Sequence, residues 1–182
     1  AGDDPNMMGK QREAFRRVID DPDNNMNQLM MRVLKDTDTE VVKAMFENFF
    51  LNANFIGWQT QEQMRKKYNC NIPWAILLDP TSACNLKCTG CWAAEYGNKL
   101  NLTFDEIDSI IMQGKELGVY FYIYTGGEPL VRKKDLIALC RKHHDCQFLT
   151  FTNGTLIDEE FADQMLDVKN LVPAISVEGF EE

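Results

Sequence analysis

The alternation of strand-like and helix-like segments after residue 74 most constrains the fold of this chain. The expected strands, which are short and rich in β-branched or aromatic residues, lie at 75–79, 119–124, 147–151 and, after Pro173, 174–177. Helical patterns separate them, and two of these begin with capping signals, a Thr103/Glu106 capping box and Asp158. Strands and helices at this spacing form right-handed βαβ units. The sequence therefore predicts an α/β fold with a parallel sheet.

The residues before this region have a helical pattern instead. We expect a helical N-terminal segment at 1–73 and an α/β region at 74–182. Asp21 with Pro22 predicts the start of one helix, and Thr37 with Glu40 predicts the start of another. An aromatic-rich stretch at 46–58 either packs against the α/β region or lies on a membrane surface, and its interrupting Asn and Glu residues favour packing.

Charge and hydropathy exclude several classes of function. The chain has 182 residues and a net charge of -9 at pH 7. Affinity for a phosphate backbone comes from Lys and Arg, so we expect no nucleic-acid partner. The sequence contains neither a signal peptide nor an apolar run near the roughly 18 residues that cross a bilayer. We therefore expect a cytoplasmic protein with no transmembrane segment.

Three cysteines directly after the first expected strand point to metal chemistry. Cys84, Cys88 and Cys91 have the spacing CxxxCxxC. A structural zinc site normally has four protein ligands, and ordinary iron–sulfur clusters have four thiolates. Three thiols leave one coordination position open, where a small molecule can bind. The spacing alone leaves an iron–sulfur cluster and a zinc ion as alternatives.

Other unusual residues also follow strands. The turn Gly126-Gly127-Glu128-Pro129 follows the second expected strand, Asn153 follows the third, and Ser176 and Glu178 close the fourth. In parallel α/β folds, ligands bind beyond the carboxyl ends of the strands. We therefore expect these residues and the three cysteines to form one binding site.

The CxxxCxxC motif followed by the GGEP turn resembles the core of the radical S-adenosylmethionine (radical SAM) superfamily, from about residue 74 to residue 182. The resemblance implies a partial (βα) TIM-like barrel with about four βα units. It also implies a [4Fe–4S] cluster bound by Cys84, Cys88 and Cys91, with S-adenosylmethionine (SAM) chelating the fourth iron. Members of the superfamily cleave SAM reductively, and the resulting 5′-deoxyadenosyl radical abstracts hydrogen from a substrate.

Roles for the other site residues follow from the same resemblance. Gly126 and Gly127 can adopt positive φ, and the turn that they form with Glu128 and Pro129 would contact the methionine amino group of SAM. Glu128 either bonds to that ammonium or braces the turn. Asn153 corresponds to a position that contacts the SAM carboxylate. Ser176 and Glu178, the last two site residues, correspond to positions that hold the ribose hydroxyls.

The sequence departs from the family at one point. Members usually have an aromatic residue before the third cysteine, near the adenine, whereas this chain has Gly90. Trp92 or Tyr96 is expected to supply that packing, and the alternative for Trp92 is a place in the core.

The substrate is undefined by the sequence, and peptide modification and cofactor or lipid maturation are both consistent with it. An electron donor such as flavodoxin or ferredoxin is the other expected partner. A non-catalytic zinc or iron–sulfur module and an electron carrier are the competing functions. Because the chain ends at Glu182 directly after a strand, we expect a longer natural polypeptide.

The remaining cysteines and the histidines have simpler expected roles. Cys70, Cys140 and Cys146 are expected to be buried, inert thiols, and the alternative for them is ligation of an auxiliary cluster. His143 and His144 are expected to lie at a solvated helix end, where the helix dipole favours an imidazolium.

Overall fold

The computed structural model describes residues 7–97 and 99–177. The chain divides into two compact units, residues 1–42 and 43–182. The helices that precede the sheet are α1 (Met7–Asp20), α2 (Asn25–Asp36), α3 (Thr39–Met45), the π-helix η1 (Phe46–Ile56) and α4 (Gly57–Tyr68). The elements that follow are β1 (Ala75–Thr81), η2 (Trp92–Tyr96), α5 (Phe104–Glu116), β2 (Phe121–Gly126), η3 (Pro129–Arg132), α6 (Lys133–Lys142), β3 (Gln147–Thr152), α7 (Glu159–Val168) and β4 (Leu171–Ile175).

The first unit contains α1, α2 and the start of α3, and two of its helices begin later than the sequence predicted. Asn24, not Asp21, caps α2, because its side-chain oxygen accepts a hydrogen bond from the Met26 N–H at 2.9 Å. Asp38, not Thr37, caps α3 by accepting from the Glu40 N–H at 2.8 Å. Thr37 instead ends α2, since its N–H still bonds within that helix. Short polar residues cluster at both junctions, and the sequence does not show which one caps.

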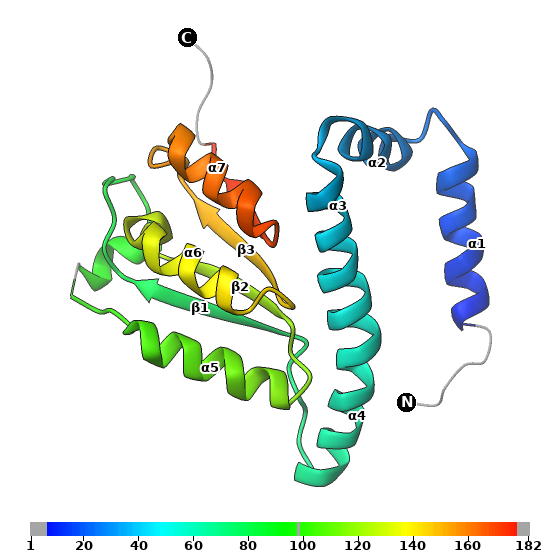
Figure 1. The fold of residues 1–182 in the computed structure, drawn as a ribbon, viewed down its shortest axis with the longest axis horizontal. Helices are drawn as coiled ribbons and strands as arrows, with labels where there is room; N and C mark the ends of the chain where they lie inside the picture. Colours follow the sequence, from blue (N-terminus) through cyan, green and yellow to red (C-terminus); the bar gives the residue numbers. More distant parts are fainter. Residues whose placement is uncertain (1–6, 98, 178–182) are drawn as a thin grey trace. The chain divides into compact units, whose positions relative to one another are not determined.

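The second unit is built on a four-stranded parallel sheet in the order β1-β2-β3-β4, which confirms the predicted α/β fold (Figure 1). Side chains on one face of the sheet, such as Tyr122, Tyr124 and Phe148, are fully buried in a core that also takes in Ile107 of α5 and Phe161 of α7. The connecting helices therefore cover this face.

The opposite face is more open among the described residues. Leu77 of β1 is 59% exposed and Phe151 of β3 is 44% exposed.

β4 begins before Pro173, at Leu171, and so earlier than the sequence predicted. The Asn170 carbonyl and the Ser176 N–H both bond to β3, so even-numbered backbone groups face that strand and the Pro173 nitrogen points away from it. A proline at this position removes no hydrogen bond between β3 and β4.

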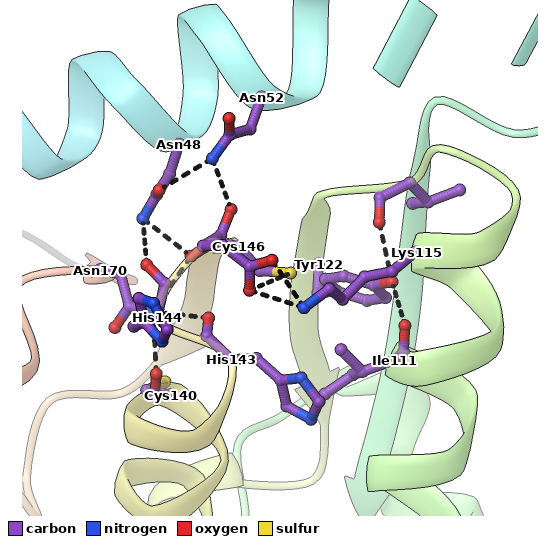
Figure 2. A network of polar contacts seen from close by, with 12 residues as sticks. Asn48, Asn52, Ile111, Lys115, Tyr122, Cys140, His143, His144, Cys146 and Asn170 are labelled. Atoms are coloured by element: carbon purple, nitrogen blue, oxygen red, sulfur yellow. Dashed lines mark hydrogen bonds and ion pairs between the residues drawn. The ribbon is translucent and has the colours of Figure 1, made fainter. Parts of the chain in front are cut away.

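Polar side chains close the end of the sheet from which the strands start (Figure 2). The Asn170 amide donates to the carbonyls of Cys140, His143 and Cys146 at 3.0–3.1 Å. Asn170 is fully buried, and in this position one side chain satisfies carbonyls from the end of α6 and the start of β3. Buried carbonyls that would otherwise lack a partner are costly, so this asparagine fixes how α6 meets β3.

Helix η1 packs against the same end of the sheet through its asparagines. The Asn48 amide donates to the carbonyls of His144 and Cys146 at 2.9 and 3.1 Å, and the Asn52 amide donates to the Asp145 carbonyl at 2.9 Å (Figure 2). Two of the polar residues that interrupt the aromatic stretch, Asn48 and Asn52, therefore face this end of the sheet.

The aromatic residues of this stretch have a mixed environment. Phe49 contacts Trp74 and Phe121 edge-on, with ring centroids 5.8 and 5.2 Å apart, whereas Phe55 and Trp58 are 61% and 55% exposed. The segment thus packs on the α/β region as expected, through Phe49 as well as through Asn48 and Asn52. No helix within the described residues is long and apolar enough to cross a membrane.

Two residues among the histidines and the cysteines outside the CxxxCxxC motif differ from the sequence-based expectation. His143 is buried, and its Nε2 lies 2.9 Å from Oδ1 of Asp108 on α5, so only His144 is at a solvated position. The end of α6 lies against α5, which the sequence pattern of α6 alone does not reveal. Cys70 is exposed after α4. Cys140 and Cys146 are buried as expected, and burial raises the pKa of both thiols.

Replacing Asn48 with Ala tests the polar docking of η1. The variant removes the side-chain donor of the His144 carbonyl and leaves the Cys146 carbonyl with Asn170 alone. The free energy of unfolding should therefore fall by about 1–3 kcal/mol in urea denaturation followed by circular dichroism. Asn54→Ala is the control, because Asn54 is exposed and donates to the Phe49 carbonyl of its own helix. The control should change stability by less than about 0.5 kcal/mol. Equal losses in the two variants would contradict the proposed importance of the Asn48 contact.

Candidate functional site

The cysteines lie in a loop that leaves and re-enters the structure through a narrow neck, formed by residues 80–82 and 100–102. The Ser82 N–H donates to the Leu100 carbonyl at 2.7 Å, and the Leu102 N–H donates to the Pro80 carbonyl at 3.2 Å. The side chain of Ser82 also accepts from the Leu100 N–H at 3.0 Å. The two sides of the neck run antiparallel, with Thr81 opposite Asn101. The cysteine loop is therefore anchored at its base to the end of β1.

Within the loop, Cys84, Cys88 and Cys91 line one pocket of about 300 Å³ together with Gly127. Cys84 is partly buried, whereas Cys88 and Cys91 are exposed. The described lining of this pocket contains no His, Asp or Glu. Across the described part of the chain, no three His, Cys, Asp or Glu side chains converge closely enough to hold a metal ion. The three thiols thus share a pocket without forming a preassembled metal site.

The glycines of the turn after β2 pack directly on this loop. A Cβ on Gly127 would lie 2.3 Å from the Ala83 carbonyl oxygen and 2.6 Å from that of Ser82. The Gly127 N–H donates to the Thr81 carbonyl at 3.0 Å, and the Glu128 N–H donates to the Ala83 carbonyl at 2.8 Å. Gly127 is therefore required for close approach. Gly126, with φ of 102°, is the only one of the pair with positive φ.

Glu128 braces the turn, which was one of its two expected roles. Its side chain is 1% exposed and accepts three hydrogen bonds, from the Leu130 N–H at 3.0 Å, the Thr152 hydroxyl at 2.7 Å and the Asn153 N–H at 2.8 Å. Two of these donors lie at the end of β3. The carboxylate therefore joins the turn after β2 to the loop after β3, and Pro129 begins the short helix η3 immediately afterwards.

Asn153 contacts the cysteine loop from the other side. Its amide donates to Oδ1 of Asn85 at 2.9 Å, and the Asn85 amide donates to the Thr155 hydroxyl at 2.8 Å. The Thr155 hydroxyl in turn donates to Oδ1 of Asn153 at 2.7 Å. These three side chains form a closed ring of hydrogen bonds between the cysteine loop and the loop after β3. The sequence contains no signal for Asn85 as part of this ring.

A second pocket of about 620 Å³ adjoins the first and shares Ser82, Ala93 and Gly127 with it. Trp92 and Tyr96 line this second pocket with their ring centroids 5.9 Å apart. Their exposed fractions are 59% and 57%, so Trp92 is not a core residue. The two aromatic rings offer an apolar surface for a planar group beside the cysteines.

Gly90, the departure from the family pattern, has a backbone reason. Its φ is 77°, in the left-handed region that side-chain-bearing residues rarely adopt. An aromatic residue at this position would be strained, so in this loop the aromatic surface comes from Trp92 and Tyr96 instead.

The site residues expected on β4 are only partly described. Ser176 is exposed, and its N–H donates to the Thr152 carbonyl at 2.8 Å, so its backbone continues the sheet beside the loop after β3. Glu178 lies outside the described residues. The structure therefore brings together the cysteines, the turn, Asn153 and Ser176 at one edge of the sheet.

Comparisons with known proteins agree with this arrangement. A model of the radical SAM superfamily matches residues 78–182. An Fe-coproporphyrin III synthase from Methanosarcina barkeri is 32% identical over 113 residues, which are 59% of this chain and 28% of that protein. A PqqA peptide cyclase from Bradyrhizobium diazoefficiens is 32% identical over 115 residues, covering 61% of this chain and 30% of the relative. The chain thus spans less than a third of the length of these two relatives.

The fold is also found among solved structures. The structure of Streptococcus suis SuiB bound to S-adenosylmethionine matches with a TM-score of 0.53 and 25% sequence identity. The match covers 64% of this chain and 28% of SuiB. The family model covers more than half of the chain, and it includes the end of β1, the cysteine loop, the turn after β2 and the other three strands. This chain belongs to the radical SAM superfamily.

Proposed function

We propose that the chain carries the cluster- and SAM-binding part of a radical SAM enzyme. The observation that supports this most directly is the pocket in which three thiols meet Gly127 of the turn and whose described lining has no His, Asp or Glu as a further metal ligand. Cys84, Cys88 and Cys91 are soft ligands, which suit an iron–sulfur cluster, and three of them leave one iron open. The donor set therefore fits a [4Fe–4S] cluster with one exchangeable position. When bound, the cluster supplies the electron for reductive cleavage of SAM.

The chain's own residues would hold SAM beside that position. The turn from Gly126 to Pro129 meets the cysteine loop closely enough for its backbone to contact the methionine end of SAM. Trp92 and Tyr96 would pack on the adenine, and their place in the lining of the adjoining pocket supports this role. These positions extend from the thiols along one edge of the sheet, as an elongated ligand requires.

The polar residues after β3 and β4 complete the proposed SAM site. Asn153 would contact the SAM carboxylate, and its side chain must then exchange its bond to Asn85 for a bond to the ligand. Ser176 and Glu178 would hold the ribose hydroxyls. Glu128 supports the site indirectly, because its carboxylate is occupied by three protein donors.

Two partners follow from the proposed chemistry. One is a low-potential electron donor such as flavodoxin or ferredoxin, which would deliver one electron for each SAM that is cleaved. The other is the substrate, for which we propose a peptide or a small cofactor-type molecule. The names of the relatives include both kinds, a peptide cyclase and a coproporphyrin synthase. SuiB itself has been solved with a precursor peptide.

Anaerobic reconstitution of the full-length protein tests the proposal. After reduction with dithionite in the presence of SAM, we expect 5′-deoxyadenosine and methionine as products. Metal analysis should give about four iron and four sulfide per chain. An intact, reduced cluster that forms no 5′-deoxyadenosine would overturn the enzymatic proposal. One zinc per chain would favour the non-catalytic module, and a cluster spectrum that SAM does not change would favour an electron carrier.

Two cysteine substitutions separate the cluster ligands from the structural thiols. Cys88→Ala should abolish cluster binding, because two thiolates cannot hold the cluster in place of three. Cys140→Ala should retain the cluster, since burial raises the pKa of the Cys140 thiol and keeps it from acting as a thiolate ligand. Both results are measured as the iron content per chain and as the absorbance of the thiolate-to-iron charge-transfer bands. Loss of iron in Cys140→Ala would show that the buried thiol has a role that we have not assigned.

Gly127→Ala tests the contact between the turn and the cysteine loop. The added Cβ would force the backbone at Ala83 away from the turn, so SAM affinity should fall by about tenfold or more, equivalent to about 1.4 kcal/mol. Calorimetric titration of the oxidised, reconstituted protein with SAM gives this affinity, because SAM is not cleaved without reduction. Gly9→Ala is a matched control, because a Cβ on Gly9 meets nothing within 4 Å. Unchanged SAM affinity in Gly127→Ala would argue against a role for this contact.

A further inference from the structure

Arg132 links the turn after β2 to the neck of the cysteine loop. Its Nη1 donates to the Pro80 carbonyl at 2.8 Å and also to the Leu102 carbonyl. These two carbonyls belong to opposite sides of the neck, one where the chain enters the cysteine loop and one where it leaves. One guanidinium group therefore connects both sides of the neck.

The rest of the guanidinium is held by an acid from the next helix. Nε and Nη2 of Arg132 donate to Oδ2 of Asp135 at 3.0 and 2.7 Å. The side chain of Arg132 is 17% exposed, so water screens these contacts less than at an open surface. A planar group with several fixed donors can satisfy two carbonyls and a carboxylate together, whereas a lysine ammonium is a single compact charge.

The position of Arg132 gives these bonds a wider effect. Glu128, four residues earlier, joins the same turn to the end of β3 through Thr152 and Asn153. The short segment 128–132 therefore bonds to the cysteine loop on one side and to the loop after β3 on the other. The long cysteine loop has little regular structure of its own between its neck and η2. Contacts at the neck are therefore needed to restrict the conformations that this loop can adopt.

We propose that Arg132 is a positioning residue that holds the neck closed and so keeps the three cysteines beside the SAM-binding turn. It touches neither the cysteines nor the pocket that they line. The consequence for cluster and SAM binding rests on the proposed function. The effect on the neck rests only on the contacts of Arg132 and can be measured without a cluster.

Hydrogen–deuterium exchange of the cluster-free protein tests the effect on the neck. In Arg132→Met, peptides that cover residues 80–82 and 100–102 should exchange at least about fivefold faster, because the Ser82 and Leu102 amides lose their protected environment. Peptides from β2 and β3 should keep the wild-type rate. Arg141→Met is the matched control, since Arg141 pairs with Asp167 and the side chains of both are more than half exposed. The control should leave exchange in the neck unchanged.

Arg132→Lys and Asp135→Asn make the test decisive if Arg132→Met is globally unstable. Lysine can reach one carbonyl but cannot replace both, so exchange in the neck should lie between wild type and Arg132→Met. Asp135→Asn keeps the arginine and should have a smaller effect than either. The proposal is overturned if exchange in the neck stays at the wild-type rate in Arg132→Lys while Arg132→Met has no effect. It is also overturned if exchange in the neck stays at that rate in Arg132→Lys while Arg132→Met accelerates every peptide equally.

The reconstituted full-length protein tests the consequence for the site. Arg132→Met should lose iron in air at least about threefold faster than Arg141→Met and should have a higher KM for SAM, with a smaller change in kcat. If the wild-type protein binds no cluster, the proposed function fails while the exchange result still stands. If the wild type is active and Arg132→Met retains both iron and KM, the positioning role for the cofactor site is wrong.

Discussion

The close backbone contact between the turn after β2 and the start of the cysteine loop determines the geometry of the candidate site. Gly127 has no room for a side chain because the carbonyls of Ser82 and Ala83 lie against it. Two backbone hydrogen bonds, from the N–H groups of Gly127 and Glu128, fix the same contact. Without it, the three cysteines would have no fixed position relative to the proposed SAM-binding turn. The paired glycines are therefore explained by packing as well as by conformational freedom.

Buried polar side chains stabilise the two ends of the sheet in different ways. At the carboxyl ends of the strands, Glu128 accepts bonds from backbone and hydroxyl donors and joins neighbouring loops. At the opposite end, the amides of Asn48 and Asn170 donate to carbonyls at the end of α6 and just before β3 (Figure 2). A carboxylate and an amide serve these roles because one only accepts hydrogen bonds and the other can donate two. Helix η1 is thereby tied to the end that faces away from the candidate site.

Much of the α/β region could be predicted from local patterns. Continuous apolar runs indicated the buried strands, and the Thr103/Glu106 capping box begins α5 as expected, with both of its hydrogen bonds formed. The N-terminal helices were harder, because Asp21 and Thr37 compete with nearby short polar residues for the capping position. Asn48 and Asn52 were read as interruptions of an apolar face. Their partners are backbone carbonyls more than 90 residues away, and no local pattern reports them.

By itself the sequence determined the element types, the parallel sheet, the family and the group of residues that gathers at one edge, because these depend on periodicity, capping and motif order. Only the tertiary structure decided what those residues do to one another. It placed Glu128 as a brace between loops, gave the Gly90 backbone a conformation that disfavours an aromatic side chain, and brought Arg132 to the neck of the cysteine loop. The physical reason is that these roles depend on contacts between segments that are distant in the chain. The sequence shows only the spacing of the three thiols, whereas such contacts determine the position of the cysteine loop.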